Sequence, residues 1–579
     1  MDDEVFVASS KGLGISFITY EMIYASMKRE GRLLAIPGGV DDFREIREGG
    51  YYFVDKSELV SDIVNDRSKV FLFTRPRRFG KSLNLSMIDA FFNLEYKGNK
   101  WFDGLKVNSH PEVEEHRNAY PVIRLCMKDL VADDVEGFNG RLKLMLKSVY
   151  RGFKYLRDSD LVDEDLRREY FSAGDLSDMQ MERSVIALCQ MLEQHHGVKP
   201  IVLIDEYDNP INNAFNRDFY AGVMGSLRRF YSLTLKGNPH MSFAVVTGVM
   251  QIAKESIFSG LNNLRVDNVF SKKFDERYGF TEPEVKDLCT YYGHPEKFEE
   301  AKEWYDGYRF GNADIYNPWS LLTYIYNDFE PGTYWADTSG NDILETFLDG
   351  LDDRTYGDLV ALGNGKTVFK QIYPSVSMRD VGGDLDAVYS VMAVAGYLNA
   401  VPEGDDIYSL SIPNREMYKV FYENVTRPLK MDVRIAMRRF LDSMERKDVQ
   451  GVEDALFTLF ADSFPATLLK DEGDYQLILA TIALGRGGRY DVGIEREAGN
   501  GRADIIMRRN DPRYPNIVVE LKKSRSKTDI FNTMEKEARK TLTQIKTKEY
   551  YLGMKGNTYL YGVCLQNKKA KVLFEELDL

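Results

Sequence analysis

Short apolar runs separated by polar, helix-length segments characterise the first half of the chain. The runs lie at residues 70–73, 121–127, 200–204 and 241–248. They are rich in β-branched and aromatic residues and lack an alternating polar face, which is typical of strands buried on both sides of a parallel sheet. After the first run, a short loop is followed by apolar residues at helical spacing: Leu83, Met87, Ile88 and Phe91. This pattern predicts an α/β domain.

The last hundred residues show a different pattern. Residues 475–484 have helical spacing, and the apolar runs 501–507 and 516–522 are separated by a turn-rich stretch. Two such runs joined by a turn predict a β-hairpin. A closing strand is expected at 558–565, after a helix that carries Ala538, Leu542 and Ile545. We therefore expect a second α/β domain at the C-terminus.

Composition and charge restrict the possible classes of protein. The 579 residues are enough for about three or four domains, and no apolar run is long enough to predict a membrane span. The net charge of −14 argues against nucleic-acid binding along the whole chain. Residues 501–579 nevertheless contain 17 Lys and Arg against 10 Asp and Glu, a net of +7 that leaves −21 on the rest. A nucleic-acid surface is therefore expected in the last domain or near Arg75, Arg77 and Arg78.

Cysteine usage and the start of the chain indicate an intracellular compartment. The four cysteines are scattered singly and lack the spacing of zinc sites, so we expect reduced core thiols; they are Cys126, Cys189, Cys289 and Cys564. The first four residues include three acidic ones, whereas a secretory or mitochondrial leader would be basic. We expect a cytoplasmic protein.

The sequence Gly80-Lys81-Ser82 lies between an expected strand and an expected helix. Unpaired backbone N–H groups and the helix dipole favour anions at such a helix N-terminus. In a phosphate-binding loop the Lys reaches the β and γ phosphates of a nucleotide, and the Ser hydroxyl joins the Mg²⁺ shell. Arg75 stands where the pattern G-x-x-x-x-G-K-[ST] has its first Gly, which restricts the turn. A basic surface turn is the alternative interpretation.

Two carboxylates, Asp205 and Glu206, follow the buried run at 200–204. The C-terminal ends of parallel strands open on the crevice where ligands bind. We therefore expect Asp205 to hold Mg²⁺ and Glu206 to polarise the water that attacks ATP. A core strand followed by an acidic turn would give the same sequence.

A second group of charged residues lies on the C-terminal hairpin. Glu520 and Lys522 share a face of the expected strand because side chains alternate with period two, and the hairpin can bring Asp504 beside them. This set predicts a metal-dependent phosphodiesterase centre, in which Asp504 and Glu520 bind Mg²⁺ or Mn²⁺ and Lys522 orients or helps to deprotonate the attacking water. Oxygen ligands without a His or Cys cluster disfavour zinc. A solvated strand face is the alternative.

Seven segments together carry a family resemblance. They are Tyr52–Lys56, Arg75–Ser82, Leu203–Asp208, Thr247–Gly248, Phe258–Leu264, Gly279–Thr281 and Trp304–Tyr308. The chain from about residue 35 onward resembles a bacterial and archaeal AAA-ATPase-like family whose members carry a C-terminal PD-(D/E)XK nuclease domain. Arg75 in place of the first Gly is itself typical of that family, whereas Gln251 stands where relatives usually have Arg.

The resemblance implies the domain organisation of the chain. It consists of an N-terminal extension at 1–35, an AAA-type P-loop core at 36–274, a helical lid or winged-helix-like region at 275–345, a mainly helical connecting domain at 346–465, and a restriction-endonuclease-like α/β domain at 466–579.

The resemblance also implies roles for individual residues. Thr247 would sense the γ-phosphate, although a strand ending in Thr-Gly is also merely common. Gln544 would lie near the nuclease centre, and either Glu472 or Glu497 would supply a further metal carboxylate. The full set expected to contact the nucleotide is Arg75, Arg78, Phe79, Gly80, Lys81, Ser82, Asp205 and Thr247.

These observations favour an ATP-driven nuclease that acts on DNA rather than RNA and has no membrane partner. An arginine finger would require a neighbouring subunit or domain, so a homo-oligomer is possible. One alternative is a nucleotide-dependent switch or scaffold that binds nucleic acid without cutting it. Another is an ATPase that hydrolyses little, given Arg75, and acts by binding.

Overall fold

The structure is a computed structural model with two compact units, formed by residues 1–339 with 370–408 and by residues 340–369 with 409–579. It describes residues 33–171, 176–215, 217–251, 264–335, 358, 361–362, 365–376, 385–426, 431–462, 490–498, 501–524, 530–566 and 569–579. Glu472, the expected helix at 475–484 and most of the segment Phe258–Leu264 lie outside the described residues.

The first unit is built on a five-stranded parallel sheet with the order β2-β3-β4-β1-β5. The strands are β1 (Val70–Thr74), β2 (Val122–Cys126), β3 (Ile201–Asp205), β4 (Ala244–Gly248) and β5 (Leu264–Asp267). β1 and β4 are buried along their whole length. The four apolar runs of the sequence therefore form adjacent strands, and β5 is a strand that the pattern did not indicate.

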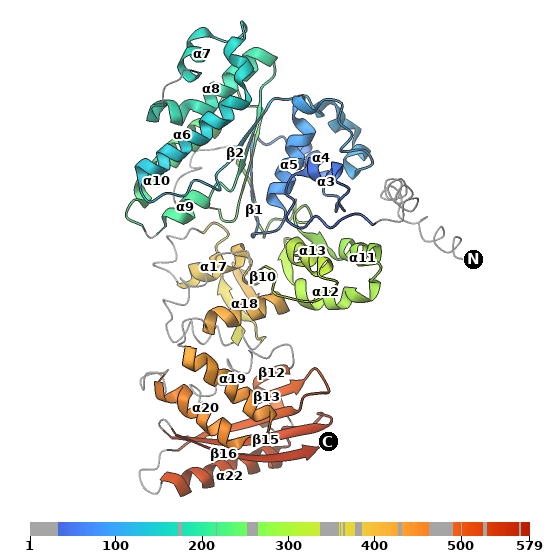
Figure 1. The fold of residues 1–579 in the computed structure, drawn as a ribbon, viewed down its shortest axis with the longest axis vertical. Coiled ribbons are helices and arrows are strands. Elements are labelled where there is room, and N and C mark those ends of the chain that lie inside the picture. The colour runs from blue at the N-terminus through green and yellow to red at the C-terminus, as the bar shows by residue number, and fades with distance from the viewer. Residues whose placement is uncertain are drawn as a thin grey trace, which may run out of the picture. The chain divides into compact units, whose positions relative to one another are not determined.

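Helices cover both faces of this sheet, as the blue and cyan helices of Figure 1 show. They are α3 (Phe43–Glu48), α4 (Glu58–Asp66), α5 (Lys81–Phe92), α6 (Val135–Gly152), α7 (Glu164–Tyr170), α8 (Asp178–His196), α9 (Asn209–Ala214) and α10 (Tyr220–Leu235). Val70 and Leu72 of β1 share a core with α6, α8 and α10. Phe71 and Phe73 share another with α4 and α5, because side chains alternate along the strand.

Short 3₁₀ helices lie in the connections of the first unit. They are Leu94–Tyr96, Lys106–Ser109, Pro111–His116, Lys154–Asp158 and Pro295–Lys297. The longest helix there, α8, has clear local signals at both ends. A capping box formed by Ser177 and Gln180 satisfies its first N–H groups, and Gly197 ends it with a left-handed φ of 72°.

A smaller module follows the sheet within the same unit. It contains a three-stranded antiparallel sheet with the order β6-β8-β7, and the helices α11 (Glu282–Tyr291), α12 (Phe298–Tyr305) and α13 (Pro318–Tyr326). The strands are β6 (Phe280–Thr281), β7 (Tyr308–Phe310) and β8 (Ala313–Tyr316). We call residues 280–335 the β7–α13 module. Lys56 connects it to the segment before α4 through an ion pair of 2.6 Å with Glu284.

Among the described residues of the region expected to be mainly helical, three short strands accompany four longer helices. β9 (Val368–Gln371), β10 (Asn399–Gly404) and β11 (Ile407–Ser411) form a sheet with the order β10-β11-β9. The helices there are α17 (Leu385–Ala395), α18 (Arg415–Thr426), α19 (Met431–Glu445) and α20 (Val449–Asp462). The sequence pattern did not indicate these strands, which are short; β10 is largely exposed, whereas β9 and β11 are partly buried.

The second unit contains a mixed five-stranded sheet with the order β12-β13-β14-β15-β16. Its strands are β12 (Tyr490–Ala498), β13 (Gly501–Arg509), β14 (Asn516–Lys523), β15 (Asn557–Gln566) and β16 (Lys569–Asp578), and α22 (Ile530–Lys548) connects the parallel pair β14 and β15. The hairpin of β13 and β14 was expected. β12 was not, and β16 follows the strand that we expected to close the domain.

Each face of this second sheet has its own core. Ile505, Met507 and Val519 pack with residues of α19 and α20. On the other face, Ile506 and Val518 pack with Ile545 of α22. The sheet is therefore enclosed between helices, and the predicted α/β fold class with two different sheets is confirmed. Among the described residues, no helix is long and apolar enough to span a membrane.

Gly562 of β15 permits an unusually close approach of α22 to the sheet. A Cβ at this position would lie 2.4 Å from the carbonyl oxygen of Ala538 and 2.7 Å from Oγ1 of Thr541. Gly562 pairs with Glu520 on β14. The glycine therefore lets α22 lie directly against the strand that carries Glu520.

Replacing Gly562 with Ala should displace α22 and destabilise the second unit by about 1–3 kcal/mol, the usual cost of overpacking. Thermal unfolding together with amide hydrogen exchange of α22 measures this effect. Gly140→Ala in α6 is the matched control, because a Cβ there has no atom within 4 Å and the substitution should stabilise the helix by about 0.5–1 kcal/mol. Equal exchange of α22 in the wild type and Gly562→Ala would contradict the packing argument.

Candidate functional site

The loop between β1 and α5 has the geometry of a phosphate-binding loop. β1 ends at Thr74, residues 75–80 turn, and α5 begins at Lys81. Gly80 has a φ of 80° and Arg78 a φ of 71°. Left-handed backbone at two of these positions turns the chain sharply into the helix, so the first N–H groups of α5 face the space above the loop. Such a helix start attracts anions.

Arg75 corrects one expectation, because its side chain is directed away from this space. The guanidinium is completely buried and lies 2.5 Å from Oδ1 of Asp267 at the end of β5. It also donates to the carbonyl oxygens of Thr74, Asp267 and Phe274 at 2.9–3.3 Å. Arg75 therefore fixes the loop to the sheet edge instead of contacting a nucleotide with its side chain.

The other long side chains of the loop contact the β7–α13 module. The Phe79 ring is buried and lies 5.1 Å from the rings of both Tyr308 and Phe310, so its side chain is a packing group. The Arg78 guanidinium lies 4.3 Å from the centre of the Trp319 ring. The indole N–H of Trp335 donates to the Arg77 carbonyl oxygen at 3.3 Å. The loop is thus held by side-chain packing along most of its length.

Lys81 is buried at the start of α5. Its Nζ donates to the carbonyl oxygens of Arg75 at 3.0 Å and of Pro76 at 2.8 Å. Burial lowers the pKa of Lys81 to about 8, while the carboxylates of Asp208 and Asp205 act in the opposite direction. The ammonium therefore lies beneath the loop, close to the acidic end of β3.

The C-terminal end of β3 presents carboxylates beside Lys81. Asp205 accepts hydrogen bonds from the hydroxyl of Thr247 and from the N–H of Glu206. The structure thus uses the Thr247 side chain, which is fully buried, to fix Asp205. Glu206 has a left-handed φ of 52°, which is unusual for a residue with a long side chain. Burial raises the pKa of Glu206, and the neighbouring Asp205 raises it further.

Asp208 is a site residue that the sequence pattern did not single out. It is 2% exposed, and its Oδ2 accepts from the N–H groups of Val249 and Met250 at 3.0 and 2.9 Å. Burial raises the pKa of Asp208, while those two N–H groups lower it. The signal was present in the sequence, because Asp208 follows Glu206 by two residues in one acidic run.

A cleft of about 590 Å³ joins these groups, within the roughly 300–1,000 Å³ of small-molecule sites. Its polar lining includes Gly80, Lys81, Ser82, Asp205, Glu206 and Asp208. Lys128, on the loop after β2, lines it as well and was also not anticipated. Aromatic side chains line it too, among them Tyr52, Phe53 and Trp319. The lining therefore offers groups for an anion with a cation and for an aromatic group.

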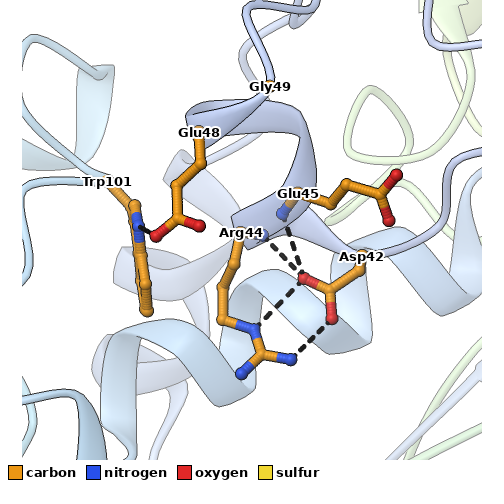
Figure 2. Close-up of a pocket in the computed structure, with 6 residues that line it drawn as sticks. All are labelled: Asp42, Arg44, Glu45, Glu48, Gly49 and Trp101. Carbon is orange, nitrogen blue, oxygen red and sulfur yellow. Dashed lines mark hydrogen bonds and ion pairs between the residues drawn. The ribbon is translucent and has the colours of Figure 1, made fainter.

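A second hollow, of about 580 Å³, lies on the surface beside α3 (Figure 2). Its charged groups bind one another: Asp42 accepts from the N–H of Arg44 at 2.8 Å and from the Arg44 guanidinium at 2.7 Å. The indole N–H of Trp101 donates to Glu48 at 2.7 Å. Because Asp42 also caps α3, we attribute this arrangement to helix stability.

The second acidic group lies on the β13–β14 hairpin, on the side of the Ile505–Val519 pair away from the turn. The register pairs Ile505 with Val519, which places Asp504 opposite Glu520. The N–H of Leu521 donates to Oδ2 of Asp504 at 2.6 Å, and the N–H of Asp504 lies 3.4 Å from Oε2 of Glu520. Each carboxylate is therefore fixed by backbone of the opposite strand. Oxygen ligands held in this way fit a hard divalent cation.

Gln544 of α22 joins this acidic group. Its side-chain N–H₂ donates to Oε1 of Glu520 and to the hydroxyl of Tyr550. Lys522 lies two residues beyond Glu520 on β14 and is exposed. Glu497 lies on β12, where its backbone pairs with Arg502. Within the described ranges, no three His, Cys, Asp or Glu side chains gather as a metal cluster.

Comparison with known families defines the class of the protein. Residues 37–258 match the family described as predicted AAA-ATPase, and residues 470–575 match the PD-(D/E)XK nuclease superfamily. The chain thus combines an AAA-ATPase-like domain with a PD-(D/E)XK superfamily domain, and the predicted architecture is confirmed.

Individual relatives were also found. An uncharacterized protein in the vnfD 5′ region of Azotobacter chroococcum mcd 1 is 28% identical over 502 residues, which cover 82% of this chain and 86% of that protein. Among solved structures, a Walker-type ATPase of Pyrococcus abyssi is 16% identical and covers 65% of this chain and 97% of its own, with a TM-score of 0.35. Because that TM-score is low, the assignment of the fold rests on the strand order and the two family matches.

The Arg75–Asp267 pair should contribute strongly to the stability of the first unit. Asp267→Asn leaves the Arg75 charge buried without its counter-ion, which typically costs about 3–5 kcal/mol. Urea unfolding followed by tryptophan fluorescence measures this loss, because all four tryptophans lie between residues 101 and 335.

Arg168→Ala is the matched control for Asp267→Asn. It removes an exposed ion pair with Glu164 on α7 and should cost no more than about 1 kcal/mol. If the Asp267→Asn variant unfolds at the same urea concentration as the Arg168→Ala control and the wild type, the structural role of Arg75 is contradicted.

Proposed function

We propose that the protein binds and hydrolyses ATP in the cleft of the first unit and cleaves DNA phosphodiesters at the acidic group of the second. The proposal rests on the class of protein, an AAA-ATPase-like domain with a PD-(D/E)XK superfamily domain. The observation that carries it is the opposition of Asp504 and Glu520 across the hairpin, with Gln544 bonded to Glu520.

In the cleft, the helix N-terminus and Lys81 would bind the β and γ phosphates. Lys81 would exchange its hydrogen bonds with the loop carbonyls for bonds to phosphate oxygens. Ser82 and Asp205 supply oxygens suited to Mg²⁺, and Glu206, whose pKa is raised by burial, would polarise the attacking water. The aromatic residues that line the cleft, Tyr52, Phe53 and Trp319, would contact the base.

In the second unit, Asp504 and Glu520 would hold one or two divalent cations. A bound Mg²⁺ or Mn²⁺ would stabilise the negative charge that develops on the phosphoryl oxygens and on the leaving oxygen. Lys522 would orient a water whose oxygen forms a new bond to phosphorus while the bond to the leaving sugar oxygen breaks. The leaving oxygen takes up a proton, so the products are a phosphate monoester and a hydroxyl. The net charge of +7 on residues 501–579 supports a polyanionic substrate.

The alternative is a switch or scaffold that binds nucleic acid without cutting it, for which the net charge of +7 on residues 501–579 would be sufficient. In that case Asp504 and Glu520 would order the hairpin, and Lys522 would contact a phosphate. Either function could involve more than one copy of the chain.

The nuclease proposal is tested with purified protein, plasmid DNA, Mn²⁺ and ATP. Wild-type protein should convert supercoiled plasmid to nicked or linear forms. Asp504→Ala should reduce cleavage by more than the roughly 10–100-fold that outer-shell partners contribute, because it removes a ligand. Asp511→Ala, in the turn of the same hairpin and paired with Arg513, is the matched control and should cut like the wild type.

If wild-type protein binds the plasmid but leaves it intact with Mg²⁺ and with Mn²⁺, in the presence and absence of ATP, the nuclease proposal is wrong and the scaffold function replaces it. If Asp504→Ala cuts as well as the wild type, the cleavage comes from another site or a contaminant, and the assignment of Asp504 and Glu520 fails.

A further inference from the structure

Tyr550 lies beside the acidic group of the second unit although it is far from it in sequence. α22 ends at Lys548, Glu549 has a left-handed φ of 53°, and the N–H of Tyr550 donates to the Ile545 carbonyl oxygen at 3.2 Å. The chain therefore turns back at the helix end and carries the tyrosine ring toward the sheet. The ring is 2% exposed.

Gly501, at the start of β13, makes room for this ring. A Cβ on Gly501 would lie 3.3 Å from Cε1 and 3.4 Å from the hydroxyl oxygen of Tyr550. The shorter separation is tighter than most Cβ contacts, so a Cβ there would require the tyrosine to shift by a few tenths of an ångström. The lack of a side chain at Gly501, which begins the Gly-Arg-x-Asp sequence, thus leaves space for Tyr550.

A chain of hydrogen bonds leads from Tyr550 to a proposed metal ligand. The side-chain N–H₂ of Gln544 has two protons; one is donated to the Tyr550 hydroxyl at 3.3 Å and the other to Oε1 of Glu520. Oε2 of Glu520 lies 3.4 Å from the N–H of Asp504. The amide of Gln544 is therefore held at both of its donors, and the plane of the Glu520 carboxylate is fixed at both of its oxygens.

The phenol remains neutral in this setting. Burial raises the pKa of Tyr550, the hydrogen bond from Gln544 lowers it, and the charges of Glu520 and Asp504 raise it further. A neutral hydroxyl accepts the hydrogen bond from Gln544 without adding a negative charge beside Glu520 and Asp504. The hydroxyl accordingly acts on Gln544 as an uncharged hydrogen-bond partner.

We propose that Tyr550 is a positioning residue for the cation site: it orients Gln544, which in turn orients Glu520. This inference rests on the proposed function, because it assigns a role toward the divalent cation there. Outer-shell partners of metal ligands commonly fix the ligand orientation, and their loss costs about 10–100-fold in metal affinity. A pre-oriented carboxylate loses less conformational freedom when a cation binds.

Tyr550→Phe isolates this role, because it keeps the ring and removes the hydroxyl. Mn²⁺ binding to the full chain, measured by calorimetry, should weaken by about 10–100-fold in Tyr550→Phe. Cleavage by this variant should fall at low Mn²⁺ and recover at saturating Mn²⁺, since the hydroxyl does not contact the reacting atoms. Tyr551→Phe, a half-buried neighbour, is the matched control and should bind Mn²⁺ like the wild type.

A double-mutant cycle with Gln544→Leu separates positioning from a general effect on folding. If Tyr550 acts through Gln544, Tyr550→Phe should change the Mn²⁺ affinity of Gln544→Leu by less than about twofold, because coupled substitutions are not additive. Independent, multiplicative losses would overturn the inference. The cycle also decides the question if Tyr550→Phe lowers the thermal stability.

The outcomes distinguish this inference from the proposed function. If wild-type protein shows no Mn²⁺ binding that Asp504→Ala removes, the proposed cation site itself is wrong. If wild-type protein binds Mn²⁺ through Asp504 and Tyr550→Phe binds it equally well, the cation site stands and the role of Tyr550 is overturned.

Discussion

The buried ion pair between Arg75 and Asp267 is the constraint on which the nucleotide cleft depends. A phosphate-binding loop usually bends with glycine at its start, whereas this loop begins with a long charged residue. The conformation is fixed by the 2.5 Å contact with Asp267 and by hydrogen bonds to the carbonyl oxygens of Thr74, Asp267 and Phe274. A fully buried guanidinium is tolerated because its charge is paired and most of its N–H groups are bonded.

In this arrangement, some residues of the loop pack against protein and others line the cleft. The side chains of Arg75 and Phe79 are directed into protein, and Arg78 stacks on Trp319. The backbone at Gly80 and the side chains of Lys81 and Ser82 line the cleft. The same contacts connect the loop to the β7–α13 module. Any movement of the loop on phosphate binding would therefore change the surroundings of Trp319 and Trp335.

The two candidate sites, which lie in different sheets, hold their carboxylates in the same way. In each, a carboxylate on a strand is fixed by a group from the neighbouring strand. Asp205 is held by the Thr247 hydroxyl of β4, and Asp504 by the Leu521 N–H of β14. Fixing an acidic group in advance reduces the cost of binding a cation. The similarity explains why both sites were visible in the sequence as acidic residues directly beside buried apolar runs.

Local sequence patterns predicted the strands that are continuously apolar. They failed where the role of a residue depends on a partner distant in the sequence. The strands at 70–73 and 200–204 were evident because they are continuously apolar. β5 was missed because its burial is mixed, and β12 because it precedes the recognised hairpin. Arg75 was taken as a nucleotide contact because its partner Asp267 is 192 residues away. Tyr550 carried no local signal, since its role depends on how α22 ends.

The dependence of nucleotide affinity on the protonation of Lys81 tests the central claim most directly. Calorimetry would measure the affinity of wild-type and Lys81→Ala protein for the Mg²⁺ complex of a non-hydrolysable ATP analogue, from about pH 7 to pH 10. In the protein without nucleotide, the pKa of Lys81 is about 8. Because the phosphates bind the charged ammonium, wild-type affinity should be constant below that pH and fall by up to about tenfold per pH unit above it. Lys81→Ala should bind weakly, without this step. Equal affinity of the two proteins throughout the range would contradict the assignment of the loop as a nucleotide site.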